Sequence, residues 1–103
     1  MANMKLGYTP THPGEVLKDE IEYRKLSQTK LAKQMGISYK ILNDILNERR
    51  PVTTTTAMMF EAALGIPAYS LINIQTAYNL HVASCDKTFT TRLAKIHEMT
   101  AIL

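Results

Sequence analysis

Residues 28–47 read Q-T-K-L-A-K-Q-M-G-I-S-Y-K-I-L-N-D-I-L-N and decide the fold of this chain. Two short helical patterns are joined by a turn that contains Gly36 and Ser38, and Ala32 lies four residues before the glycine. A small residue lets the two helices approach, glycine accepts the left-handed backbone that ends the first helix, and serine caps the second. This spacing predicts a helix-turn-helix.

The second helical pattern divides into an apolar face and a polar face. Leu42 and Ile45 are expected to hold this helix against the core, so that its polar side remains available to a DNA major groove. Together with the flanking positions, this pattern supplies the predicted DNA-binding residues: Gln28, Ser38, Tyr39, Lys40, Asn43, Asn47, Arg49 and Arg50.

Residue chemistry suggests a role for several of these side chains. Asn43 is the strongest candidate for reading a base, because an amide can pair with adenine through two hydrogen bonds. Lys40 suits a guanine edge or a phosphate, and Tyr39 suits a thymine methyl group with its ring and a phosphate with its hydroxyl. Asp44 is awkward beside a polyanion. The alternatives are that it accepts from a cytosine amine, orients Lys40 one helical turn away, or lies just off the groove, and we favour the last two together.

The remaining candidates are predicted to contact the DNA backbone. Gln28 begins the first helix of the motif, where outward-pointing N–H groups favour a phosphate. Arg49 and Arg50 follow the second helix and are placed to clamp the backbone. The formal net charge of the chain is only +3, but residues 24–50 hold seven Lys or Arg against two acidic residues. The basic excess therefore surrounds the motif, as expected for phosphate binding.

Helical signals occur along the whole chain, and no useful stretch alternates with the period of a strand. Besides the two helices of the motif, helices are predicted from about His12, from one of the threonines at 53–56 to Gly65, over roughly 68–82 and from about Thr88. The fold class is therefore all-α, a five-helix domain with an added C-terminal amphipathic helix. We expect a flexible arm over residues 1–10, the DNA-binding domain over 11–83 and a C-terminal element over 84–103.

The C-terminal element carries an apolar stripe at helical spacing, made of Phe89, Leu93, Ile96, Met99 and Leu103. The stripe either folds back onto the core or pairs with a second copy of the chain. A five-helix domain can fill its own core, so we favour a homodimer. Two recognition helices related by a two-fold axis would read half-sites about 34 Å apart.

Several classes of function are disfavoured by composition. No apolar run approaches the ~20 residues of a membrane span, and the start of the chain lacks the pattern of a signal peptide. The lone Cys85 excludes an internal disulfide and suits the cytoplasm; we expect it to be buried or half-buried. The three histidines are scattered, so we predict no enzyme, no metal site and no cofactor.

The chain also resembles a known family over about residues 12–80. The resemblance rests on these segments: His12-Pro13-Gly14-Glu15-Val16-Leu17, Leu26-Ser27-Gln28, Leu31-Ala32, Gly36-Ile37-Ser38, Ile45-Leu46-Asn47, Arg49-Arg50-Pro51-Val52-Thr53, Ala63-Leu64-Gly65, Leu71-Ile72-Asn73-Ile74-Gln75 and Tyr78-Asn79-Leu80. They are similar to the HigA-type antitoxins, also called VapI or plasmid-maintenance antidote proteins, in the larger Xre/λ-repressor-like class. Glu48 stands where the family usually has glycine, and Tyr39 where an arginine is common.

The resemblance implies a dimeric protein that binds operator DNA, neutralises a ribonuclease toxin of the HigB type and represses the operon that both share. Two alternatives remain open from the sequence. One is a free-standing or phage-type transcriptional regulator without a toxin, which would have the same fold and DNA residues. The other is a protein-interaction adaptor that has lost DNA binding, for which Asp44 and Glu48 are the best evidence.

Overall fold

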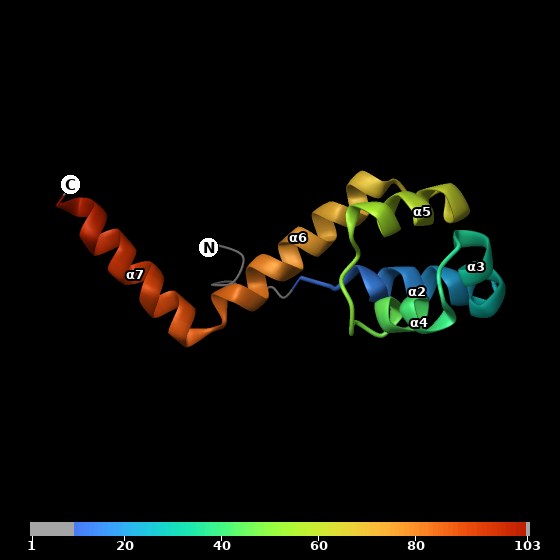
Figure 1. Cartoon of the computed structure of the whole chain (residues 1–103), viewed down its shortest axis with the longest axis horizontal. Helices are drawn as coiled ribbons and strands as arrows, with labels where there is room; N and C mark the ends of the chain where they lie inside the picture. The colour runs from blue at the N-terminus through green and yellow to red at the C-terminus, as the bar shows by residue number, and fades with distance from the viewer. Residues whose placement is uncertain (1–9, 103) are drawn as a thin grey trace. The chain divides into compact units, whose positions relative to one another are not determined.

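The computed structural model describes residues 10–102, and these form six α-helices and no strand (Figure 1). The helices are α2 (Pro13–Tyr23), α3 (Gln28–Met35), α4 (Tyr39–Leu46), α5 (Thr54–Leu64), α6 (Ala68–Ser84) and α7 (Lys87–Ala101). The predicted all-α class and the order of its helices are confirmed. The predicted N-terminal arm lies almost wholly outside the described residues. No helix in the described part of the chain has the length and apolar character needed to cross a membrane.

The structure consists of two compact units, and the boundary between them falls inside α6, between residues 76 and 77. The first unit, residues 11–76, holds α2 to α5 and the start of α6. The rest of α6 and α7 belong to the second unit. The domain limits expected from the sequence, at residues 83 and 84, stay a prediction.

Local capping signals set the bounds of the helix-turn-helix. Ser27 accepts a hydrogen bond from the Lys30 N–H at 3.3 Å, and Ser38 accepts one from the Ile41 N–H at 3.1 Å. Between them Gly36 ends α3 with a φ of +75°, in the left-handed region that glycine adopts without steric cost. Helix α3 therefore begins and ends where the sequence predicts, and α4 begins directly after its predicted serine cap.

One apolar core holds the first unit together. Its most deeply buried large side chains are Leu17, Ile21, Leu42, Ile45, Leu46, Phe60 and Leu71. Helix α4 packs against α2 and α3, and α3 also packs against α5. Each of these side chains contributes about 1.5–3 kcal/mol by leaving water. The recognition helix α4 is thus fixed from its apolar side.

The start of α2 makes an unusually close contact with the end of α4. The imidazole of His12 caps α2, because its Nδ1 accepts a hydrogen bond from the Gly14 N–H at 2.8 Å, and Pro13 takes the first helical position. Burial lowers the pKa of His12, against the opposing charge of Glu48, and so favours the neutral ring that can accept this bond. Gly14 lies so close to the carbonyl oxygen of Ile45 that a Cβ atom would overlap it.

Two polar side chains hold segments of the first unit that are far apart in sequence. Arg24 pairs with Glu20 at 2.7 Å and donates to the carbonyl of Leu64 at 2.9 Å, at the end of α5. The buried amide of Gln75 accepts from the Val52 N–H at 2.8 Å and so fastens the loop after α4 to α6. Arg24 therefore serves the fold, although its charge belongs to the basic excess around the motif.

One packing expectation is wrong. Cys85 is exposed instead of buried, because it lies in the turn between α6 and α7, where its backbone N–H bonds to the end of α6.

Replacing Gly14 with alanine tests the contact between α2 and α4. We expect Gly14→Ala to lower the free energy of unfolding by roughly 2 kcal/mol or more, because the new methyl group meets backbone that cannot rotate away. Asp19→Ala, on the exposed side of the same helix, is the matched control and should stay within about 0.5 kcal/mol. The measurement is urea denaturation monitored by circular dichroism. Equal midpoints for the two variants would contradict the close contact.

Candidate DNA-binding surface

The outer face of α4 presents the polar side chains that the sequence assigns to DNA. Tyr39 is 50% exposed and the Lys40 side chain 81% exposed. Asn43 is half-buried, one turn further along. Gln28 lies at the start of α3. The Asn43 Nδ2 donates to the Gln28 Oε1 and to the Tyr39 hydroxyl oxygen, each at 3.5 Å. Gln28, Tyr39 and Asn43 thus form one polar cluster, and the exposed Lys40 follows Tyr39 in the chain.

Asp44 is only 8% exposed and lies off the outer face, which is one of the positions expected for it from the sequence. Its Oδ2 accepts from Lys40 Nζ and its Oδ1 from Arg49 Nε, both at 3.1 Å. Pairing with Lys40 one turn earlier was among the expected alternatives. The pairing with Arg49 was not expected, because Arg49 lies beyond the end of the helix.

The charge of Asp44 is balanced inside the protein. The hydrogen bond from Lys40 is the main cause that holds the pKa of this carboxyl below its ordinary value. Burial works in the opposite direction, and the Arg49 guanidinium and the two positive charges lower the pKa again. The carboxylate is therefore ionised at neutral pH and shared by two cations, so it does not present an uncompensated negative charge to a polyanion.

Arg49 turns back over α4 instead of extending away from it. Its Nη2 donates to the Asn43 Oδ1 at 2.9 Å while its Nε holds Asp44. A guanidinium can only donate, so the amide oxygen of Asn43 must face Arg49 and its NH₂ group must face Gln28 and Tyr39. The structure thereby joins Arg49 to the face that carries the base-reading candidate.

Asn47 and Ser38 are engaged at the two ends of α4. The Asn47 Nδ2 donates to the Asn43 carbonyl at 2.9 Å, and its Oδ1 accepts from Lys18 Nζ at 3.3 Å. Ser38 uses its hydroxyl oxygen as the helix cap. Lys18 belongs to α2, and no local sequence signal connects it with this surface.

Arg50 differs from its neighbour. It is exposed, and its side chain makes no hydrogen bond or ion pair with any residue that the structure describes. The adjacent arginines, which were given one role from the sequence, therefore occupy different environments.

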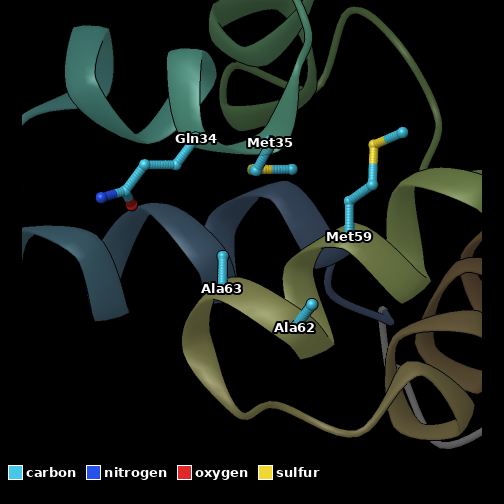
Figure 2. A pocket seen from close by; sticks show the side chains of 5 residues that line it. All are labelled: Gln34, Met35, Met59, Ala62 and Ala63. Carbon is cyan, nitrogen blue, oxygen red and sulfur yellow. The ribbon is translucent and has the colours of Figure 1, made fainter.

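An open hollow of about 350 Å³ lies elsewhere, between α3 and α5 (Figure 2). Its lining comprises Gln34, Met35, Met59, Ala62 and Ala63. Figure 2 shows Met35 and Met59 on the two facing helices. None of the residues that line it is titratable, so the hollow offers no general acid, base or nucleophile.

The fold and the exposed polar face of α4 define a helix-turn-helix protein of the DNA-binding class. A model of the helix-turn-helix family matches residues 17–71. Virulence-associated protein I from Dichelobacter nodosus is 40% identical over 77 residues, which are 74% of this chain and 71% of that protein. The chain belongs to the Xre-type helix-turn-helix family, in the group of HigA- and VapI-like proteins, and this is not a family of enzymes.

Solved structures agree with this assignment. An addiction module antidote protein of the HigA family from Coxiella burnetii superposes with a TM-score of 0.73 and 32% identity, over 84% of this chain and 94% of that chain. A Pseudomonas aeruginosa protein in complex with its operator DNA superposes with a TM-score of 0.68 and 32% identity, over 72% of this chain and 82% of that chain. The Pseudomonas aeruginosa antitoxin HigA with the higBA promoter superposes with a TM-score of 0.69 and 27% identity, over 86% of this chain and 92% of that chain. The resemblance inferred from the sequence is confirmed.

Glu48 has a φ of +64°, in the left-handed region that glycine adopts without steric cost and glutamate usually avoids. Glu48→Gly should raise the free energy of unfolding by about 0.5–1 kcal/mol, since the backbone strain relieved exceeds the entropy that glycine adds to the unfolded chain. Glu48→Ala removes the same charge but keeps the strain, and it should not stabilise. Thermal unfolding would separate them, with a rise of about 2–8 °C for the glycine variant alone. A similar rise in both variants would assign the effect to charge.

Proposed function

We propose that this protein is an autoregulating antitoxin, which binds operator DNA through α4 and neutralises a ribonuclease toxin of the HigB type. The observation that carries the DNA half is the polar outer face of α4, in a fold shared with proteins solved on operator or promoter DNA. The antitoxin half is supported by the likeness to an antidote protein of the HigA family. Its place of action would be the cytoplasm, where the operator lies.

Each side chain of the surface receives a role in this proposal. Asn43 reads an adenine, with Tyr39 and Lys40 beside it at the N-terminal end of α4. Arg50 is free to contact a phosphate, and Gln28 reaches the backbone from the start of α3. Ser38 and Asn47 fix the two ends of α4 and thus its register in the groove.

We propose a homodimer, held by α7. The structure leaves its apolar stripe uncovered: Phe89, Leu93, Ile96 and Met99 are 39%, 44%, 54% and 67% exposed, and Leu103 lies outside the described residues. None of the described residues of α7 is buried. A helix with such a face gains by pairing with its copy. The dimer would bring two recognition helices onto one palindromic operator.

The two alternative functions, an adaptor without DNA binding and a free-standing regulator, are not equally supported by the surface of α4. The acidic Asp44, which was evidence for an adaptor without DNA binding, is compensated by Lys40 and Arg49. A free-standing regulator shares every feature of the DNA surface. Only the toxin separates it from the proposed antitoxin.

DNA binding is tested by fluorescence anisotropy with the protein's own upstream fragment and with a scrambled duplex, at two salt concentrations. Tight binding to the upstream fragment should fall by about 10³–10⁵ between 50 and 200 mM salt if a dimer neutralises ~6–10 phosphates. Asn43→Ala should cost ~1–3 kcal/mol and relax specificity at one base pair, whereas Arg50→Ala should weaken binding to all duplexes alike. Equal, sequence-independent losses from both variants would refute the role of Asn43.

The dimer is tested by replacing Leu93 with arginine in the middle of the stripe. Sedimentation should then show monomers at concentrations where the wild type is dimeric, because a charge would be buried in the pairing face. Lys95→Glu, on the same exposed helix but outside the stripe, is the control. A monomeric wild type would contradict this part of the proposal.

The antitoxin role is tested by co-expression. A small reading frame next to the gene should arrest growth when it is expressed alone, with cleavage of cellular RNA, and this chain should restore growth. Asn43→Ala separates the two activities: growth restored by this variant would place neutralisation away from the base-reading face. Absence of such a frame would favour the free-standing regulator.

A further inference from the structure

We propose that Arg49 reads a guanine in the major groove, and that Asp44 is the positioning residue that holds Arg49 in place for this purpose. The inference rests on the proposed DNA binding and deepens it. It replaces the phosphate clamp that the sequence suggests for Arg49 by direct base readout.

Arg49 folds back over α4. Its backbone N–H bonds to the Asp44 carbonyl at 2.8 Å, which places Arg49 in the tight turn that ends α4. Its guanidinium then returns along the helix and reaches Asn43, on the outer face. A residue that clamps the backbone beyond the helix would be expected to extend away from that face. Arg50 has the freedom to do so.

Part of the Arg49 guanidinium remains available to a ligand. The bond to Asp44 uses Nε, and the bond to Asn43 uses one hydrogen of Nη2. The hydrogens of Nη1 and the second hydrogen of Nη2 form the far end of the fork. Two N–H groups of that end fit the O6 and N7 atoms of guanine, which is the most common specific contact between proteins and DNA. The Arg49 side chain is 59% exposed and therefore accessible to a ligand.

The support that Asp44 gives to Arg49 is rigid. The Asp44 side chain is only 12% exposed, so the protein around it restricts its carboxylate. Lys40 holds the second oxygen at 3.1 Å and balances the charge. The cluster of Lys40, Asp44 and Arg49 keeps a net positive charge, which suits the groove. An arginine fixed at Nε loses less conformational freedom on binding than a free one, and it also has fewer ways to accommodate a wrong base.

Arg49 also constrains the side chain of Asn43. Because Arg49 fixes its amide oxygen, the readings by the two residues are coupled, and they are expected to specify neighbouring base pairs as one unit. The oxygen keeps a second lone pair, so the bond from Arg49 leaves Asn43 able to accept from an adenine amine.

The test measures the affinity of the full chain for its operator and for the complete set of single base-pair variants, at two salt concentrations. Arg49→Lys keeps the charge but loses the planar fork and the Nε–H that Asp44 holds, so its ammonium group is not fixed at the guanine edge. It should lose about 5- to 150-fold discrimination at one G·C pair, while its salt dependence stays that of the wild type. Asp44→Asn, which keeps the shape of the side chain, should weaken discrimination at the same pair. Arg50→Lys is the matched control and should leave every base preference unchanged.

A modified base provides a readout that a purely structural role would not move. Replacing the guanine at that pair by 7-deazaguanine removes the N7 acceptor, so the wild type should bind less tightly and Arg49→Lys should show no further loss. Should Asp44→Asn not fold, Arg49→Lys and the modified base decide the matter, because Arg49 is partly exposed. Unchanged base preferences for Arg49→Lys, with wild-type affinity on 7-deazaguanine, would overturn the inference. A wild type without preference for its own operator would instead refute the proposed function.

Discussion

The close approach of α2 to α4 is the constraint on which the remainder of the first unit depends. At Gly14 the backbone of α2 lies against the carbonyl of Ile45, and no side chain fits between them. This contact holds the far end of the recognition helix, while the apolar face of α4 is held by the core. A helix that must enter a groove at a defined angle needs both supports, because a small tilt at its base displaces the side chains at its tip. The motif His12-Pro13-Gly14 at the start of α2 therefore serves the geometry of α4, some thirty residues away in the sequence.

The surface of α4 shows how a buried charge can be balanced by two cations. Asp44 would be unfavourable beside a polyanion if it stood alone. Between Lys40 and Arg49 it becomes an anchor that organises two cations. The neighbouring arginines thereby diverge: one is drawn back onto the helix, and the other is left to the solvent. The same composition, read as a charge count, would have given both the same role.

Much of the fold was predictable from the sequence because the signals that set it are local. Ser27, Gly36 and Ser38 act on backbone atoms within three residues of themselves or on their own φ, so the bounds of α3 and α4 could be read directly. The family segments were recognisable for the same reason. The error on Cys85 arose from a general preference of cysteine for burial, which the turn after α6 overrides.

The sequence by itself determined the helices, the helix-turn-helix and which polar residues share the face proposed to contact DNA, since the spacing of side chains on a helix is fixed by its 3.6-residue period. The tertiary structure decided how those residues act together. The return of Arg49 over α4, the burial of Asp44 and the bond from Lys18 to Asn47 depend on a turn and on packing between helices. A left-handed backbone at Glu48 helps to form that turn, and glutamate as a residue type does not predict it, because it usually avoids this region. Periodicity describes one helix at a time, whereas the contacts that position a recognition surface run between elements.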